Sequence, residues 1–210
     1  MKLYFASATC SFAPHIVLQE LGLPYNLVRV DNQTKLMSEP GDFLTINPKG
    51  YVAALALDTG DVLTEGPAIL QYLADLNPDL GLAPANGTLE RARLQEWLNF
   101  VTSEIHAGSS PLFNRDLPET VRDLFGVRLT RRFDLIETGL ATQEYLMGDC
   151  FTVADAYLFT VLGWMKGFGI DLSRWPKVAA YMRRIEARPS VAAALEREAA
   201  VPFMTRATVC

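Results

Sequence analysis

The chain has 210 residues, of which 50% are apolar, and a formal net charge of −5. This length and composition suffice for a substantial core in one large or two small domains. The acidic balance supplies no basic field for a polyanion, and the densest basic pairs, Arg131-Arg132 and Arg183-Arg184, lie in helical patterns that favour a solvated face. Nucleic acid is therefore not an expected partner.

The three cysteines, Cys10, Cys150 and Cys210, are sparse, odd in number and without the spacing of metal ligands. They predict neither a disulfide framework nor a metal site, and they fit a reducing compartment. The apolar stretch at the N-terminus is too short for a signal peptide, and the run at 156–165 is too short to span a bilayer. We expect a cytoplasmic protein without a membrane-spanning part.

The first 76 residues alternate between strand and helix patterns, as a small α/β domain does. Asp58-Thr59-Gly60 predicts a hairpin turn, because glycine adopts positive φ at little cost. Thr64 is the expected N-cap of the last helix in this half. The order predicts a four-stranded mixed sheet with helices on its faces. The expected elements are a strand at 2–6, a helix closed by Gly22, a strand at 27–30, a loop at 31–41, a short helix at 42–46, strands at 52–57 and 61–63, and a helix at 65–74.

Residues 77–87 are rich in proline, glycine, asparagine and aspartate, which predicts a linker. From residue 88 to residue 210 the pattern contains no convincing strand, and apolar stripes at helical spacing predict an all-helical domain. The clearest stripes are Leu94, Trp97, Leu98, Val101 and Ile105, then Phe125, Leu129, Phe133, Ile136 and Leu140, with further helices expected around Tyr181 to Ile185 and Val191 to Leu195.

A segment that starts at Val153 is apolar almost all round and is expected to be the core helix of the second domain. Thr152 and Asp155 have the spacing of an N-terminal capping box. Capping is therefore the preferred role for Asp155, ahead of a catalytic one.

Cys10 lies where the first strand gives way to the first helix. A thiol at a helix N-terminus is close to unpaired backbone N–H groups and the positive end of the dipole, both of which stabilise the thiolate. The position predicts a nucleophile near neutral pH, with a small packed cysteine as the alternative.

A second helix start, at 63–67, combines Gly66, which permits close backbone approach, with the polar residues Thr64 and Glu65. Such a start can hold a carboxylate. Capping alone would also explain Thr64.

Asn99, Ser103 and His106 fall at i, i+4 and i+7 on one helical face, opposite the apolar stripe. A solvent-facing stripe is the ordinary explanation, but these short hydrogen-bonding side chains also suit the wall of a cleft. His15, the only other histidine, is expected to be structural.

Taken in order, these motifs resemble the beta class of bacterial glutathione S-transferases over essentially the whole chain. The runs that carry the likeness are MKLYF, Cys10-Ser11 with Pro14-His15-Ile16-Val17-Leu18, INPKG, LTEGPAILQYLADLNPD, EWLNF, SEIH, PLF and FTVADAYLFT. The resemblance implies a thioredoxin-like α/β domain at 1–76, a linker at 77–87 and an all-α domain at 88–210. It also implies a homodimer with a glutathione site in the cleft between the domains.

The resemblance assigns roles to residues of the first domain. Cys10 faces the glutathione sulfur and can form a mixed disulfide with it. Positions matching Tyr51 and Val52 bind the glutathione backbone through main-chain groups. Those matching Glu65 and Gly66 hold the γ-glutamyl end, and Lys35 approaches the glycyl carboxylate.

In the second domain, the resemblance places Asn99, Ser103 and His106 on the inner wall of the cleft, with His106 near the thiol. Glu104 is implied to reach across the dimer interface. A pocket for a hydrophobic electrophile is expected from Phe5, Phe113, Trp164 and Phe168.

Two positions depart from the family pattern. Ala53 replaces a proline whose cis peptide bond places the Val52 backbone against glutathione. Cis bonds before other residues are unfavourable, so the loop either keeps this geometry without proline or relaxes to trans. Ala107 replaces a lysine that commonly follows His106 and removes a positive charge near the sulfur.

The implied function is conjugation of reduced glutathione to electrophilic small molecules in detoxification, with glutathione as co-substrate and no prosthetic group or metal. Cys10 adds possible thiol–disulfide exchange or reduction of peroxides and disulfides. Two alternatives stay open: a non-catalytic interaction protein that retains the fold, and glutathione-dependent isomerisation or dehalogenation.

Overall fold

The computed structural model describes residues 1–202 and forms two compact units. The first unit combines residues 1–77 with residues 188–202, and the second comprises residues 78–187. The expected mixed sheet and helical second half are both confirmed. The last helix, however, groups with the first unit, whereas the sequence-based division assigned it to the second domain.

The first unit is built on a four-stranded sheet with the order β2-β1-β3-β4. β1 (Lys2–Phe5) pairs in parallel with β2 (Asn26–Arg29) and antiparallel with β3 (Ala54–Ala56), which pairs with β4 (Val62–Thr64). The turn between β3 and β4 is closed by a hydrogen bond from Gly60 N to Leu57 O, and Gly60 has a φ of 92°. The predicted hairpin is therefore confirmed.

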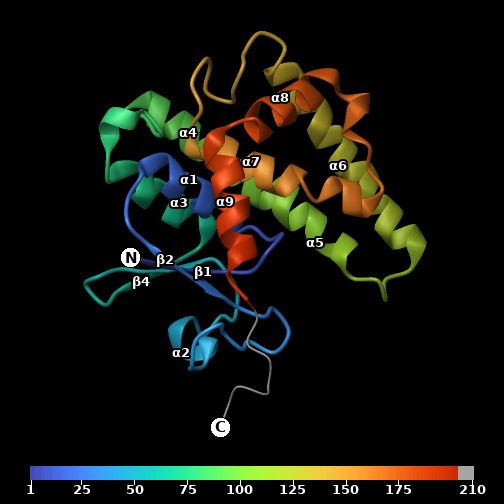
Figure 1. Ribbon diagram of the computed structural model, residues 1–210. Coiled ribbons are helices and arrows are strands. Elements are labelled where there is room, and N and C mark those ends of the chain that lie inside the picture. Colours follow the sequence, from blue (N-terminus) through green and yellow to red (C-terminus); the bar gives the residue numbers. More distant parts are fainter. Residues whose placement is uncertain (203–210) are drawn as a thin grey trace. The chain divides into compact units, whose positions relative to one another are not determined.

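The two faces of this sheet carry different helices (Figure 1). α1 (Phe12–Leu21) and α3 (Gly66–Asp75) pack together on one face, and the short α2 (Phe43–Ile46) lies on the other. Because side chains alternate along a strand, β1 serves both cores: Tyr4 contacts Phe43 of α2, and Phe5 contacts His15 of α1. Phe5 is fully buried, so the expectation that it lines an open pocket is wrong.

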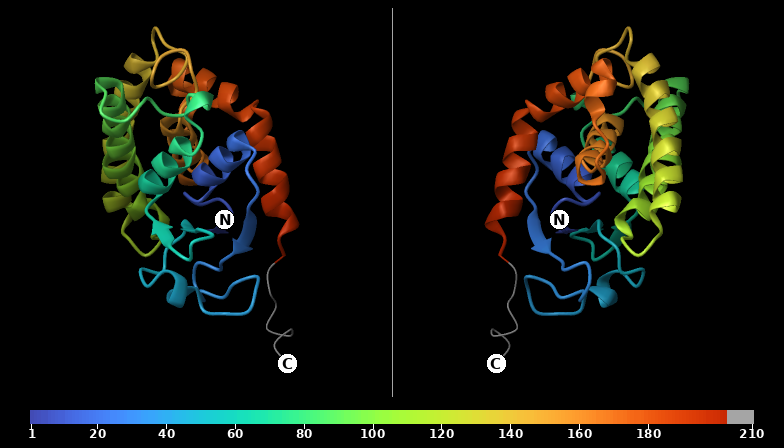
Figure 2. Two further views of the ribbon diagram at one scale, coloured as in Figure 1. Left: turned by 90° about the vertical axis from the view of Figure 1, so that its left-hand side faces the viewer. Right: turned by 90° about the vertical axis from the view of Figure 1, so that its right-hand side faces the viewer.

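The last helix, α9 (Pro189–Ala200), runs beside α1, as both views in Figure 2 show. His15 Nδ1 and Glu198 Oε1 lie 3.0 Å apart, and both side chains are almost completely buried. Arg188 donates to Glu20 at 2.8 Å. These contacts confirm a structural role for His15 and explain why α9 belongs to the first unit. Cys210 lies outside the described residues.

The second unit contains one long helical segment whose geometry changes along its length. α4 (Leu89–Phe100) continues as a π-helix, η2 (Val101–His106), and then as α5 (Ala107–Phe113). A π-helix has i→i+5 hydrogen bonds and turns more slowly than an α-helix. The uniform α-helical period that we assumed for Asn99, Ser103 and His106 is therefore wrong across this segment.

The remaining helices complete the second unit. α7 is the predicted core helix: nine of its ten residues are buried, and Thr152 and Asp155 form the predicted capping box. The elements are η1 (Pro78–Leu80), α6 (Glu119–Gly139), α7 (Val153–Leu162), η3 (Met165–Phe168), η4 (Leu172–Arg174) and α8 (Pro176–Glu186).

Candidate functional site

The turn that joins β1 to α1 presents Cys10. Thr9 Oγ1 and Ser11 Oγ lie 2.8 Å apart and both donate to the carbonyl of Ala6, which closes the turn. The partly buried Cys10 thiol donates to the carbonyl oxygen of Val52 at 3.3 Å. The turn therefore brings together two of the residues predicted from the sequence.

The expected activation of Cys10 is contradicted in this structure. Burial raises the pKa of the thiol to about 11 and outweighs the backbone hydrogen bonds that lower it. Cys10 also precedes Ser11, the N-cap of α1, and its S–H faces a carbonyl oxygen. A hydrogen bond from the S–H group to a carbonyl oxygen favours the protonated form of the thiol. Cys10 is accordingly a thiol at neutral pH.

The segment between α2 and β3 holds its shape through Asn47. This side chain is 2% exposed, donates to the carbonyl of Tyr51 at 2.6 Å and accepts from the N–H of Lys49 at 3.1 Å. Further along the same segment, the peptide bond between Val52 and Ala53 is cis. The loop therefore keeps the cis geometry, although alanine and not proline stands at position 53.

We expect Asn47→Ala to lower the free energy of unfolding by about 1–3 kcal/mol, because a backbone carbonyl and a backbone N–H lose their buried side-chain partner. Urea denaturation measures this change. Asn99→Ala is a suitable control, since among residues 1–202 the exposed Asn99 amide donates only to the Gln95 carbonyl of its own helix. Equal stability of both variants would contradict the role of Asn47.

The start of α3 lies next to a lysine that the sequence analysis did not single out. Lys49 Nζ donates to Glu65 Oε1 at 2.6 Å and to Thr64 Oγ1 at 3.1 Å. The first N–H groups of a helix lack partners inside it, so Gly66 begins α3 at a place that suits an anion. Thr64 ends β4 and the N-cap is Glu65, so the predicted capping role of Thr64 is wrong.

Positive φ values mark this part of the molecule. Within residues 1–202, non-glycine residues have positive φ only at Ala8, Lys35 and Glu65. Such backbone conformations are uncommon and concentrate at functional sites. Lys35 Nζ also lies 5.8 Å from the centre of the Tyr51 ring, and the Tyr51 side chain is 74% exposed. Lys35 and Tyr51, predicted separately, are therefore neighbours.

In the second unit, two predicted residues bind their own helix. Asn99 donates to the carbonyl of Gln95, and Ser103 Oγ donates to the carbonyl of Asn99. Both side chains are exposed. Their hydroxyl and amide groups keep further hydrogen-bonding capacity, because each can accept as well as donate.

Glu104 is paired inside its own unit. Its carboxylate accepts from Arg132 Nε at 2.7 Å and from Arg128 at 3.2 Å, both on α6. Hydrogen bonds from Arg132 and then Arg128 lower the pKa of Glu104. A role across a dimer interface stays a prediction.

His106 ends the π-helix and contacts an aromatic cluster. Its Nδ1 lies 2.7 Å from the Tyr157 hydroxyl, and its ring is 5.0 Å from that of Trp164. Phe113 lies between Trp164, at 5.3 Å, and Phe168, at 4.7 Å. The structure therefore brings together three of the four aromatic residues expected to bind an electrophile.

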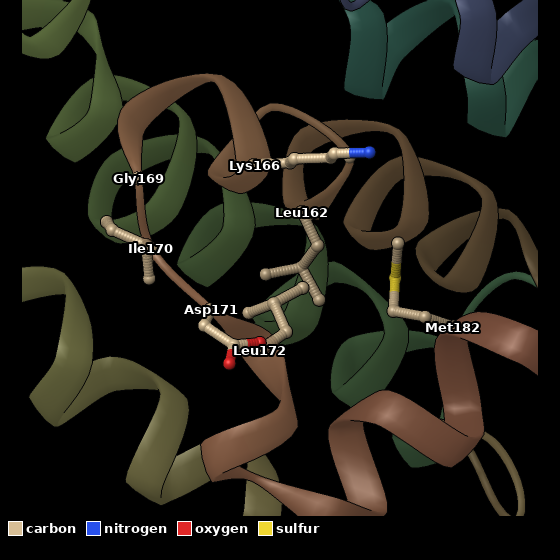
Figure 3. Close-up of a pocket in the computed structure, with 8 residues that line it drawn as sticks. Leu162, Lys166, Gly169, Ile170, Asp171, Leu172 and Met182 are labelled. Carbon is tan, nitrogen blue, oxygen red and sulfur yellow. The ribbon is translucent and has the colours of Figure 1, made fainter.

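A separate groove of about 500 Å³ lies within the second unit (Figure 3). In this view Leu162 and Leu172 face each other in the middle, and Lys166 and Asp171 stand on different sides of them. None of the residues predicted to bind glutathione lines this groove.

Within residues 1–202, no three histidine, cysteine, aspartate or glutamate residues converge as metal ligands would. No helix in this part of the chain combines the length and the hydropathy needed to cross a membrane.

Both halves of the chain match the same family of known proteins. Residues 9–76 match the family model "Glutathione S-transferase, N-terminal domain", and residues 100–189 match "Glutathione S-transferase, C-terminal domain". Glutathione S-transferase GstA of Escherichia coli O157:H7 is 41% identical over 94% of this chain and 98% of its own.

Two solved structures have nearly the same fold. One is a ternary complex of BphK, a bacterial GST, with 47% identity and a TM-score of 0.93; the match covers 95% of this chain and 100% of BphK. The other is a sphingomonad glutathione S-transferase complexed with glutathione, with 42% identity, a TM-score of 0.92 and the same coverage.

Proposed function

Since this chain belongs to the glutathione S-transferase family and uses glutathione as co-substrate, we propose that its first unit binds the tripeptide at the Cys10 turn. The observation that carries this proposal is the 3.3 Å contact between Cys10 Sγ and Val52 O. It puts a thiol beside the main-chain groups of Val52, in the segment that precedes β3. A peptide that pairs with these groups through its backbone would bring its cysteinyl sulfur to Cys10.

The remaining groups of the first unit account for the two ends of glutathione. We assign the γ-glutamyl end to Glu65 and Gly66, because the start of α3 offers backbone N–H groups next to a carboxylate. Lys35, beside the exposed ring of Tyr51, supplies a cation for the glycyl carboxylate. Tyr51 and Val52 contribute main-chain groups that Asn47 holds in place.

For the second unit, the proposal rests on family membership and local geometry. Asn99 and Ser103 contribute polar contacts to glutathione, and Glu104 acts across a homodimer interface. His106 favours the glutathione thiolate, with its ring oriented by the Tyr157 hydroxyl. The apolar rings of Phe113, Trp164 and Phe168 bind the electrophile.

In this reaction the thiol of glutathione passes its proton to water, and its sulfur then forms a bond to an electrophilic carbon. A leaving group departs with the bonding electrons, or an activated double bond accepts them. Cys10 supports the step as a hydrogen-bond donor to the thiolate sulfur: its raised pKa keeps its own proton in place, and the S–H group turns from the Val52 carbonyl to the ligand. We further propose that the protein is a cytoplasmic beta-class enzyme that detoxifies such electrophiles.

Calorimetric titration of the reduced protein with glutathione near pH 7 tests the proposal without a choice of electrophile. We expect saturable binding with Kd between micromolar and low millimolar values. A parallel titration with Cys10→Ala should show weaker binding, because the sulfur loses its donor. No heat with either protein would contradict a glutathione site in this chain and would favour a non-catalytic interaction protein.

A further inference from the structure

Lys49 contacts the two residues that precede α3 in the first unit. It lies in the segment held by Asn47, and its backbone N–H is one of the two groups bound by the Asn47 side chain. Its ammonium group is fixed by two hydrogen bonds, to Glu65 and to Thr64. Lys49 and Glu65 are both largely exposed, at 54% and 67%, so a ligand can reach them.

This ion pair has one donor and one acceptor left over. A lysine ammonium has three N–H groups, and two of them are used by Glu65 Oε1 and Thr64 Oγ1. The third N–H, and the second oxygen of Glu65, have no partner among residues 1–202. The pair therefore presents a positive donor and a negative acceptor side by side at the N-terminus of α3.

A zwitterionic α-amino acid group has the opposite arrangement of charges. We propose that Lys49 is a further binding residue of the glutathione site. Its ammonium group binds the α-carboxylate of the γ-glutamyl end, while Glu65 binds the adjacent α-ammonium. This inference rests on the proposed function. It adds a residue that neither the polar pattern nor the family resemblance indicated.

Electrostatics explains why a second charge is needed here. Glu65 alone attracts the ligand's ammonium but repels its carboxylate, and the two effects largely cancel at similar distances. Lys49 removes this repulsion and adds a charge-assisted hydrogen bond, which is stronger than a neutral one. The N–H groups at the start of α3 approach the same carboxylate from the helix. We therefore expect the site to prefer a ligand end that carries both an α-ammonium and an α-carboxylate over one that carries a carboxylate alone.

The test combines protein variants with ligand analogues. Lys49→Met removes the charge and keeps most of the side-chain length, and Lys49→Arg keeps the charge. Lys2→Met is the matched control, because Lys2 also donates to a glutamate, Glu39, at 2.7 Å on the surface of the same unit. The ligands are glutathione and its analogue with 4-aminobutyrate in place of the γ-glutamyl residue, which lacks only the α-carboxylate.

For Lys49→Met we expect about a tenfold weaker calorimetric Kd for glutathione, the scale of one charge-assisted hydrogen bond. Its affinity for the 4-aminobutyrate analogue should change less than twofold. Lys49→Arg should bind glutathione within about threefold of the wild-type protein, and Lys2→Met should match the wild type with both ligands.

Two outcomes would overturn the assignment: an unchanged Kd for glutathione in Lys49→Met, or an equal loss of affinity for both ligands, which would indicate a purely structural role. Thermal unfolding of each variant checks that the fold persists. Failure of the wild-type protein to bind glutathione would instead contradict the proposed function, so the two failures are distinguishable.

Discussion

Asp155→Ala is expected to cause the largest loss of stability of any substitution considered for this chain, roughly 3–5 kcal/mol. The carboxylate is fully buried at the start of α7 and accepts from Leu146 N, Thr152 N, Thr152 Oγ1 and the Tyr181 hydroxyl, at 2.8–3.0 Å. Alanine removes this acceptor from Leu146 N, Thr152 N and Thr152 Oγ1, whereas the Tyr181 hydroxyl keeps the backbone carbonyl of residue 155 at 3.3 Å. Each unsatisfied buried group costs about 1–3 kcal/mol.

The expected loss corresponds to a fall in Tm of roughly 6–20 °C for a protein of this size, measurable by calorimetry or circular dichroism. Asp171→Ala is the matched control, because the exposed Asp171 caps a short helix in the same way through Ser173 N and Ser173 Oγ. We expect it to cost less than about 1 kcal/mol. Similar Tm values for both variants would show that the burial of the Asp155 side chain does not determine its contribution to stability.

Thr152→Ala separates the two functions of this cluster. It removes one donor to Asp155 and the hydroxyl of the capping box, but leaves the carboxylate bound to Leu146 and Tyr181. The expected loss is about 1 kcal/mol. Asp155 thus connects the segment before α7, the helix itself and α8, which explains why one side chain matters to three parts of the second unit.

This cluster also shows what could be predicted from the sequence. The spacing of Thr152 and Asp155 is a local signal, and the predicted capping box is present. The additional bonds to Leu146 and Tyr181 join residues 9 and 26 positions away. No local pattern specifies such contacts, so the capping role was predictable while the size of its contribution was not.

The candidate site shows the same division. Glu65 and Gly66 were predicted from a helix start and from the family runs, both of which are continuous in sequence. Lys49 was missed because its role depends on contact with Glu65. The two residues are 16 positions apart, and the β3–β4 hairpin brings them together. The run INPKG was recognised as a motif, but periodicity cannot show which of its side chains reaches α3.

The π-helix was missed for a different reason. The apolar residues Val101 and Ile105 are four apart and both fully buried, which fits an α-helix as well as a π-helix. Only the hydrogen-bond pattern distinguishes the two, and it places His106 where it contacts Tyr157 and Trp164.

Cys10 is expected to react very slowly with iodoacetamide at pH 7 in the ligand-free protein. With a pKa of about 11, only about one molecule in 10,000 is a thiolate at this pH, against roughly 3 in 100 for an ordinary cysteine. The thiolate is the reactive form, so alkylation should be roughly 300-fold slower. The rate should rise about tenfold per pH unit and level off only near pH 11.

Mass spectrometry of the Cys10 peptide measures this rate, and the exposed Cys150 in the same sample is the internal control. The substitution Cys210→Ser removes the third thiol, so that only Cys10 and Cys150 react. Alkylation of Cys10 at pH 7 as fast as that of Cys150 would contradict a protonated, buried thiol and would restore the helix-start activation expected from the sequence.

The same chemistry separates the two activities considered for Cys10. As a donor to a glutathione thiolate, the S–H group can be replaced by the O–H group of Cys10→Ser, so conjugation of a model electrophile should persist within about tenfold. Thiol–disulfide exchange needs sulfur as the nucleophile and should be lost in both Cys10→Ser and Cys10→Ala. Loss of conjugation in Cys10→Ser to the level of background would show that the sulfur is required for more than a hydrogen bond. Because the raised pKa disfavours the thiolate that exchange requires, we expect conjugation to exceed exchange at neutral pH.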